Sequence, residues 1–386
     1  MRGHLQDCLT QEFGSTARKS QKSKVESRKS KVEISPEWES AIGEVVASPG
    51  VAMVVGGVDT GKTNFCVQLA NAGVEAGIST AVVDADVGQS EIGAPGTIGM
   101  ALAEKPIEAL SDLKARRLYF IGATSPVRHL IECIVGTKKM VDAAVEMGAR
   151  LVAVDTTGLV DGAIGRKLKT YKADLVRPRY LIGIQKKREI ESVLTPFEKV
   201  ESIRVMKVSS SELARRKPAE FRAARRQLNF YKHFHDAPGH IIHLDSICTW
   251  NTWLGTGRPM KWQYAKFMED TLKCRILHAE VTGRGIYAVS ERTCTRSGLA
   301  AIEEYFKTAA ITIVRGDTFT NLLVGLADEH GNTMDVGLIQ AVDFSQRFIF
   351  VLSPIKTVSP VRVVQFGSIR VGRDGKELGT LRQGEL

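Results

Sequence analysis

The feature that most constrains this sequence is a strand, a glycine-rich loop and a helix in direct succession. Apolar residues 51–55 run into the loop at residues 56–63, whose sequence GGVDTGKT fits the pattern G-x-x-x-x-G-K-[ST]. A helix is expected to begin near Lys62 and to continue through residues 64–76. A unit of this kind belongs in a parallel α/β sheet and presents backbone N–H groups to a polyphosphate. The sequence therefore predicts a P-loop fold that binds a nucleoside triphosphate.

Each kind of residue in this loop has its own expected role in nucleotide binding. Its glycines let the backbone close around phosphates, the Lys62 ammonium would reach the β- and γ-phosphates, and the Thr63 hydroxyl would ligate Mg²⁺. The expected nucleotide-binding residues are Gly56, Gly57, Val58, Asp59, Thr60, Gly61, Lys62, Thr63 and Asn64.

The length, composition and cysteine spacing of the chain favour a two-domain protein of the cytoplasm. At 386 residues, 43 % hydrophobic and 25 % charged, the chain is long enough for two domains of ordinary globular composition. It has no apolar run as long as a membrane span, and its first residues lack the apolar core of a signal peptide. The six cysteines form no C-x-x-C pair, which is typical of reduced thiols in a cytoplasmic protein.

Three regions follow one another along the chain. Residues 1–33 form a basic, polar segment that reads as a disordered tail, residues 34–244 a P-loop domain, and residues 245–386 a β-rich C-terminal domain. In the P-loop domain, helices alternate with strands expected at residues 51–55, 80–83, 117–121, 150–154 and 180–184. This alternation predicts a doubly wound parallel sheet with its site at the carboxyl ends of the strands. The C-terminal domain is expected to hold seven short strands and one helix at residues 298–306.

Carboxylates stand at two of these strand ends. Asp84 and Asp86 follow the second strand, and Asp155 ends the fourth. A carboxylate at this edge can hold hydrated Mg²⁺ and accept a proton from an acceptor hydroxyl. The alternative is that one of the first two caps the next turn.

Positive charge is concentrated on both sides of the last expected parallel strand, at residues 180–184. Residues 166–232 contain 19 Lys and Arg against 7 Asp and Glu, which favours a polyanionic second substrate, although a solvated helix face is the alternative. Arg222, Arg225 and Arg226 have helical spacing and share a face. A helix that carries them could close over the site and place a guanidinium on the transferred phosphoryl group.

The sequence DTTG at residues 155–158 also resembles the D-x-x-G switch of GTPases. Guanine-reading GTPases usually carry N-K-x-D or T-K-x-D after a later strand. Here the strand at residues 180–184 is followed by QKKR, which does not match. A GTPase is therefore the weaker interpretation.

Several longer motifs together resemble the polynucleotide 5′-hydroxyl kinases, a family that includes RNA kinases of pre-mRNA cleavage and pre-rRNA processing. The similarity extends from about residue 34 to residue 234. It rests on SPEWE, GGVDTGKT, VDADVGQSEIGAPGT, FIGATSPVRHL and an RRK…FR…RR…FY segment. The family has an ATP-binding kinase domain and a β-rich C-terminal domain, as expected here.

The resemblance implies a role for each matching residue. Lys62 and Thr63 would bind phosphates and Mg²⁺, and Asp86 would be the base that activates the 5′-hydroxyl and a second metal ligand. Arg222 and Arg225 match the catalytic lid arginines best, with Arg215 and Arg226 as rivals. Substrate-binding residues are expected at Gln89, Thr124, Ser125 and Pro126.

These observations lead to one expected function and two alternatives. The expected protein transfers the γ-phosphoryl group of ATP, with Mg²⁺, to the 5′-hydroxyl of single-stranded RNA or DNA, and RNA-processing proteins are possible partners. The first alternative is a P-loop GTPase or NTPase switch. The second is an ATP-bound, non-catalytic scaffold of an RNA-processing complex.

Overall fold

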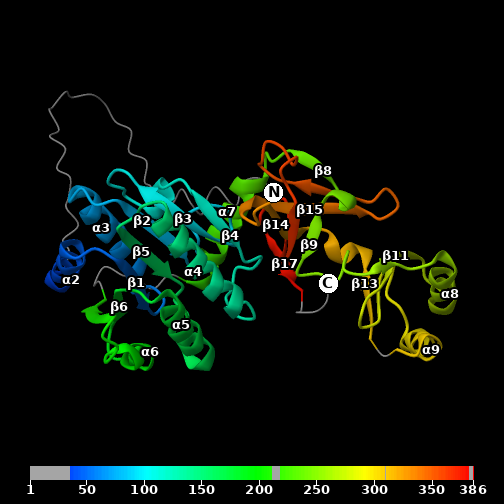
Figure 1. Cartoon of the computed structure of the whole chain (residues 1–386), viewed down its shortest axis with the longest axis horizontal. Coiled ribbons are helices and arrows are strands. Elements are labelled where there is room, and N and C mark those ends of the chain that lie inside the picture. The colour runs from blue at the N-terminus through cyan, green and yellow to red at the C-terminus, as the bar shows by residue number, and fades with distance from the viewer. Residues whose placement is uncertain (1–34, 211–217, 309, 382–385) are drawn as a thin grey trace, which may run out of the picture. The chain divides into compact units, whose positions relative to one another are not determined.

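The computed structural model describes residues 35–210, 218–308, 310–381 and 386 (Figure 1). The expected basic tail lies outside the described residues, as does Arg215. In the described parts of the chain, none of the helices has the length and apolar character needed to cross a membrane.

A five-stranded parallel sheet carries the P-loop. In spatial order its strands are β2 (Thr80–Ala85), β5 (Leu151–Thr156), β1 (Val51–Gly56), β6 (Tyr180–Gln185) and β7 (Arg204–Ser209). Both β2 and β5 are buried along their whole length, as expected for strands with helices on both faces. The predicted doubly wound parallel sheet is therefore confirmed.

Helices cover the two faces of this sheet (Figure 1). The chain passes from β1 to β2 through α3 (Lys62–Glu75). After β2 it forms two antiparallel strands beyond that edge and then returns to β5 through α4 (Leu130–Glu146). Because crossover connections are right-handed, this reversal of direction puts α3 and α4 on opposite faces. In the structure α2 (Pro36–Ala47) packs on α3, and α5 (Gly162–Val176) packs on α4. The short α6 (Glu191–Leu194) follows β6 and packs against α5.

The start of α2 follows directly from its sequence. Ser35 is the N-cap, its side-chain oxygen accepts the Trp38 N–H, and Pro36 occupies the first helical position. The Trp38 ring then packs edge-on against Phe65 of α3 at a centroid distance of 5.1 Å. Its indole N–H donates to the carbonyl of Ser209 at 2.9 Å, which ties α2 to the end of β7.

Three strands of this region differ from the sequence prediction. Two of them were not expected: β7, which pairs parallel with β6, and β3 (Thr97–Ala103), which pairs antiparallel with β2. The strand expected at residues 117–121 forms as β4 (Arg117–Phe120), but it pairs antiparallel with β3 and lies outside the parallel set. The sequence of β3, TIGMALA, has few β-branched residues, so its pairing depends on burial between neighbours rather than on propensity.

The C-terminal region is β-rich, as predicted, and continues the same sheet. Leu118 of β4 pairs with Thr333 of β15, which joins the C-terminal strands to the parallel ones. The strands of this antiparallel part are β14 (Leu322–Ala327), β15 (Thr333–Asp343), β16 (Phe348–Leu352), β17 (Val363–Val371) and β18 (Glu377–Thr380). Two further strands join them, β8 (Gly239–His243) on β16 and β9 (Cys248–Trp250) on β17. The domain boundary at residue 244 stays a prediction, and β8 and β16 pair across it.

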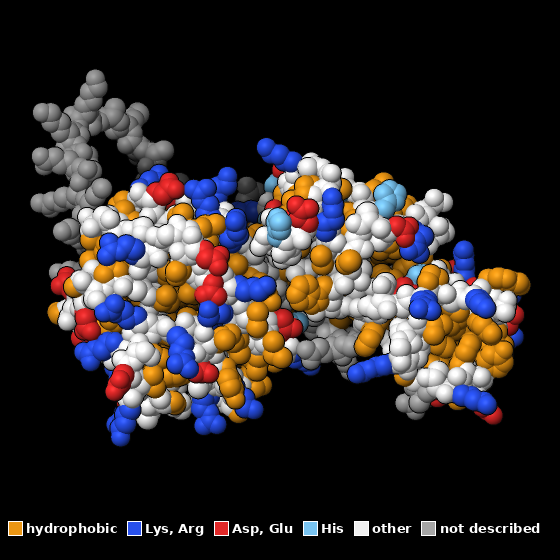
Figure 2. Space-filling model, in the orientation of Figure 1, with side chains coloured by type: hydrophobic (Ala, Val, Ile, Leu, Met, Phe, Trp, Pro, Cys, Tyr) orange, Lys and Arg blue, Asp and Glu red, His pale blue; other side chains and the backbone are white. Residues whose placement is uncertain are grey.

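A second, small sheet carries two helices on one side (Figure 1). Its strands are β10 (Arg258–Pro259), β11 (Ile276–Val281), β12 (Ile286–Ser290) and β13 (Ile311–Arg315). The helices are α8 (Trp262–Leu272), which the sequence did not predict, and α9 (Arg296–Phe306), which it did. Figure 2 shows hydrophobic side chains gathered over these helices, where Trp262 and Tyr305 are exposed.

Candidate active site

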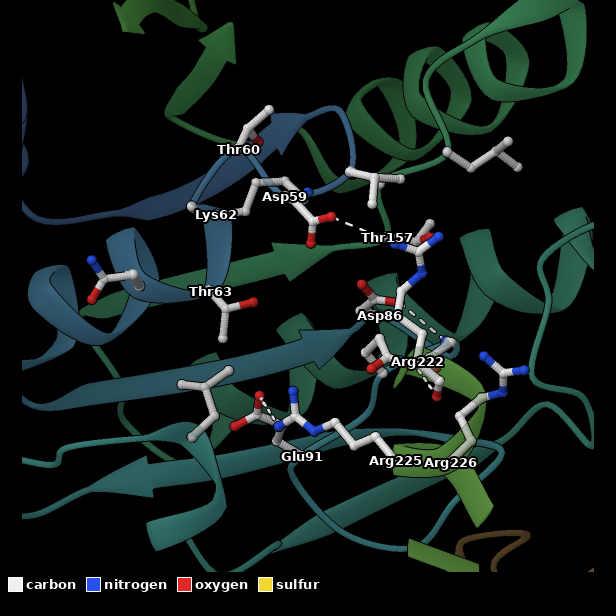
Figure 3. A pocket seen from close by; sticks show the side chains of 18 of the residues that line it. Asp59, Thr60, Lys62, Thr63, Asp86, Glu91, Thr157, Arg222, Arg225 and Arg226 are labelled. Atoms are coloured by element: carbon white, nitrogen blue, oxygen red, sulfur yellow. Dashed lines mark hydrogen bonds and ion pairs between the residues drawn. The ribbon is translucent and has the colours of Figure 1, made fainter. Parts of the chain in front are cut away.

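A cavity of about 780 Å³ opens at the carboxyl ends of the parallel strands (Figure 3). Its walls come from the phosphate loop, residues 86–91, residues 108–110, residues 125–127, residues 157–161 and α7 (Ala219–Phe234). These segments are far apart in sequence, and each follows a strand or begins a helix. The predicted convergence of strand ends on the phosphate loop is confirmed.

The phosphate loop takes its form from two positive φ angles and one close approach. Gly61 caps α3 with φ of 95°, and Asp59 has φ of 54°, a conformation that Asp tolerates better than most residues. A β-carbon on Gly56 would lie 2.5 Å from the carbonyl oxygen of Ile184, so β6 leaves no room for a side chain there. The Lys62 ammonium folds back and donates to the carbonyl of Gly57 at 2.6 Å.

Thr63 and Asp155 form a pair beneath the loop. The Thr63 hydroxyl donates to Oδ2 of Asp155 at 2.6 Å. Oδ1 of Asp155 is buried and has no hydrogen-bond partner among the described residues. Burial raises the pKa of Asp155 to about 6, while the nearby Lys62 ammonium and the Thr63 hydrogen bond act in the opposite direction.

The two aspartates at the end of β2 have different surroundings. Asp84 lies inside the strand, not after it, and is buried. Its carboxylate accepts the N–H groups of Asp86, Glu91 and Ile92, so it orders the loop that follows. Burial raises the pKa of Asp84 to about 8. Asp86 lines the cavity, and its Oδ1 accepts the Gly88 N–H at 3.0 Å. Both aspartates therefore cap the turn after β2, and of the two only Asp86 lines the cavity.

Two lysines of α5, Lys169 and Lys172, are buried, although both belong to the Lys- and Arg-rich residues 166–232. The Lys169 ammonium donates to Oγ1 of Thr156 at 2.8 Å and to the carbonyl of Thr157. Lys172 has no hydrogen-bond partner for its ammonium in the part of the chain that the structure describes. Burial lowers the pKa of both lysines. These two charges are therefore neither on a solvated helix face nor on a surface that could meet a polyanion.

The three arginines of α7 all line the cavity, and each lies against a carboxylate (Figure 3). Figure 3 shows Arg222 directed toward Asp59 of the phosphate loop and Arg225 toward Glu91, at 3.5 Å and 2.6 Å respectively. The third, Arg226, donates to Glu377 of β18 at 2.7 Å. The helical spacing predicted for these residues is confirmed, and their acidic partners come from three separate segments.

Most of the predicted site residues line this one cavity. Those that do are Val58, Asp59, Thr60, Gly61, Lys62, Thr63, Asn64, Asp86, Gln89, Ser125, Pro126, Arg222 and Arg225. Gly56, Gly57 and Thr124 are not part of its wall. The Thr124 hydroxyl instead donates to Glu377 at 3.2 Å. Gln89 donates to the carbonyl of Arg222 at 3.3 Å and so links the loop after β2 to α7.

Four residues at or near the site were not recognised from the sequence. Lys169 and Lys172 fall on the buried stripe of α5, and charge at core positions of an amphipathic helix is a signal that could have found them. Glu91 stands next to the recognised DVGQS motif. Glu377 carries no such signal, because its partners lie more than a hundred residues away.

Comparisons with known proteins show the family of this chain. Residues 56–236 match the family model of the mRNA cleavage and polyadenylation factor CLP1 P-loop. A polyribonucleotide 5′-hydroxyl-kinase of Pyrococcus furiosus is 34 % identical over 86 % of this chain and 91 % of its own length. One from Thermococcus kodakarensis is 33 % identical over 91 % of this chain and 97 % of its own length. The chain belongs to this kinase family.

The fold of this kinase family member also has a solved neighbour. A structure of Clp1p in complex with Pcf11p aligns with a TM-score of 0.53 at 12 % identity, over 86 % of this chain and 77 % of the other. The resemblance stated from the sequence motifs is confirmed. As a P-loop kinase of this family, the protein binds a nucleotide.

Proposed function

We propose that this protein transfers the γ-phosphoryl group of ATP to the 5′-hydroxyl end of a polynucleotide. The observation that carries this proposal is the meeting of Lys62, Asp86 and Arg222 on one cavity. A phosphate-binding cation, a carboxylate for the acceptor hydroxyl and a second cation are what phosphoryl transfer requires. The relatives named polyribonucleotide 5′-hydroxyl-kinases make RNA the first acceptor to test.

Each of these groups has a defined part in the reaction. Lys62 stands at the start of α3, where the helix N-terminus and the loop amides attract the β- and γ-phosphates. Asp86 accepts the proton of the 5′-hydroxyl as that oxygen attacks the γ-phosphorus. Arg222 and Arg225 place guanidinium groups over the phosphoryl group, where negative charge is spread across its oxygens in the transition state.

The proposal includes Mg²⁺, and the residues present fit it. The buried Oδ1 of Asp155 lacks a hydrogen-bond partner among the described residues, as expected for a carboxylate oxygen that ligates a metal ion. Thr63, Asp155 and Asp86 supply the hydroxyl and carboxylate oxygens that Mg²⁺ prefers. When bound by these residues, Mg²⁺ would supply positive charge against the negative charge of the phosphoryl group. Asp155, a strand-end carboxylate already noted in the sequence, thus joins Thr63 and Asp86 as a proposed ligand.

The proposed acceptor end is formed by cavity-lining residues outside the phosphate loop. Gln89, Ser125 and Pro126 line it, and the proposal gives them the terminal nucleotide. A single strand suits this cavity best, because the terminal hydroxyl has to reach Asp86 inside it. Thr124 belongs to the same loop as Ser125 and Pro126, and its hydrogen bond to Glu377 helps to hold that loop in place.

The proposal extends to the setting of the protein. We place it in the cytoplasm, since Cys66, Cys133, Cys248, Cys274 and Cys294 form no disulfide. A protein partner from RNA processing is part of the proposal because the solved neighbour Clp1p is seen with Pcf11p.

The test is a transfer assay with γ-labelled ATP, Mg²⁺ and matched 5′-hydroxyl RNA and DNA oligonucleotides. Label is expected on the oligonucleotide with the native protein and is expected to be lost in Lys62→Ala and Asp86→Asn. Lys266→Ala and Asp270→Asn are matched controls, because these residues pair on the exposed side of α8. Phosphate released from GTP without oligonucleotide labelling would favour the switch, and tight ATP binding without turnover would favour the scaffold.

A further inference from the structure

The hairpin of β17 and β18 packs against the loop at residues 122–129. The N–H groups of Ser368 and Ile369 donate to the carbonyl of Gly122 at 2.9 Å and 3.2 Å. The Ser368 hydroxyl lies 2.8 Å from Nε2 of His129 at the other end of the loop. Gly122 approaches Gly367 so closely that neither position has room for a β-carbon. The C-terminal hairpin therefore holds both ends of the loop that carries Ser125 and Pro126.

The same hairpin also packs against α7. The Gln227 side chain donates to the carbonyl of Asp374 at 3.3 Å. Gly375, with φ of 78°, lies against the carbonyl of Gln227 with no space for a side chain. The turn between β17 and β18 is therefore fitted to the backbone of the helix that carries the arginines.

One carboxylate oxygen joins these two contacts. Oε1 of Glu377 accepts the Thr124 hydroxyl at 3.2 Å and Nε of Arg226 at 2.7 Å. The side chains of Arg226 and Glu377 are 25 % and 32 % exposed, so water screens this charged hydrogen bond less than it would a surface pair. Through this one oxygen, Glu377 is thus hydrogen-bonded to the loop at residues 122–129, the acceptor loop, and to α7, the arginine helix.

We propose that Glu377 is a positioning residue that fixes the acceptor loop relative to the arginine helix, so that the C-terminal hairpin controls polynucleotide binding. This inference rests on the proposed function. In this inference the Thr124 hydroxyl donates its hydrogen bond to Glu377 and does not bind the substrate. The inference also predicts different effects on the two substrates, because the hydrogen bonds of Glu377 go to Thr124 and Arg226, whereas the phosphate loop and α3 are proposed to hold ATP.

Steady-state kinetics with a 5′-hydroxyl RNA oligonucleotide test this difference. Glu377→Ala is expected to raise the KM for the oligonucleotide about tenfold, the effect of losing one hydrogen bond to a charged group. The KM for ATP is expected to stay unchanged. Glu377→Gln keeps an acceptor oxygen and should raise the KM for the oligonucleotide less than Glu377→Ala does. The matched control is Asp245→Asn, which breaks an ion pair with Arg347 elsewhere in the C-terminal region and should change neither KM.

Hydrogen exchange and a double-mutant cycle distinguish positioning from general destabilisation. In Glu377→Ala, residues 122–129 and 219–234 are both expected to exchange faster, and the P-loop helix is not. Because Glu377 acts through Arg226, the double variant with Arg226→Ala should be no worse than the more impaired single variant.

Three outcomes would overturn the inference. These are an unchanged oligonucleotide KM, an equal rise of both KM values, or faster exchange confined to one of the two segments. A native protein that labels the oligonucleotide while Glu377→Ala behaves identically would refute this inference alone. A native protein with no transfer activity would refute the proposed function, and this inference with it.

Discussion

Replacing Asp155 by Asn is expected to stabilise the nucleotide-free protein while removing a group that the reaction needs. Burial raises the pKa of Asp155 from 3.8 to about 6, although Lys62 and the Thr63 hydroxyl oppose the rise. The ionised carboxylate therefore costs free energy in the folded protein that it does not cost in the unfolded chain. An Asn side chain has no charge, and its amide oxygen can still accept the hydrogen bond from Thr63.

The size and pH dependence of the gain follow from these pKa values. The difference between 3.8 and about 6 corresponds to about 3 kcal/mol in the free energy of unfolding. Because the folded-state pKa is the higher one, the native protein loses this amount as pH rises from about 4 to about 6. Asp155→Asn should gain about 3 kcal/mol above that window and about half as much at pH 5. For a chain of this length the full gain corresponds to about 4 °C in Tm.

Differential scanning calorimetry between pH 5 and pH 8, with EDTA and without nucleotide, measures this gain. The control is Asp142→Asn, whose carboxylate pairs with Lys138 on an exposed helix face and should shift Tm by less than about 1 °C. Adding Mg²⁺ and ATP should reverse the order, since ligand binding raises the Tm of the native protein and not that of Asp155→Asn. A Tm gain independent of pH, or no gain at all, would refute the electrostatic reasoning.

Three further substitutions test other parts of the site. Lys172→Met should raise the free energy of unfolding by about 2 kcal/mol in urea titrations, because it removes a buried charge that has no partner among the described residues; a loss of stability would contradict this. Arg222→Lys should lower kcat about 100-fold with little change in ATP affinity measured by calorimetry, since Lys cannot present a planar fork to the phosphoryl group. Gly56→Ala should lower the free energy of unfolding by about 2 kcal/mol and weaken ATP binding through its clash with Ile184, whereas Gly43→Ala, with open space in α2, should stabilise slightly.

The sequence was sufficient for four of the five parallel strands, β1, β2, β5 and β6. Strand β1 and helix α3 begin within a residue of their predicted positions, because a buried apolar run and a glycine-rich loop set them locally. It was not sufficient for β3 or β7. Strand β7, with the sequence RVMKVS, is partly exposed at the edge of the sheet, and a short edge strand of mixed polarity has no clear periodic signal.

In the site, too, local sequence motifs could be recognised and long-range contacts could not. Lys62, Asp86 and Arg222 could be selected from the sequence because each stands in a short motif or at a helical spacing. Their partners could not, since the contact of Arg225 with Glu91 and that of Arg226 with Glu377 each join residues more than 130 positions apart. The arrangement of α7 over the cavity depends on these long-range charge pairs, which only the folded chain reveals.

The charges around the cavity form a balanced set before any nucleotide binds. Arg222, Arg225 and Arg226 each lie against a carboxylate, so α7 can hold its arginines near the phosphate loop without mutual repulsion. Of the three pairs, that of Arg222 with Asp59 is the longest, at 3.5 Å, and it is the one that involves the phosphate loop itself. A bound triphosphate would place negative charge beside Asp59 and compete with it for Arg222. The shorter pairs would keep the helix in place during that exchange, which makes Arg222 the arginine best suited to follow the transferred phosphoryl group.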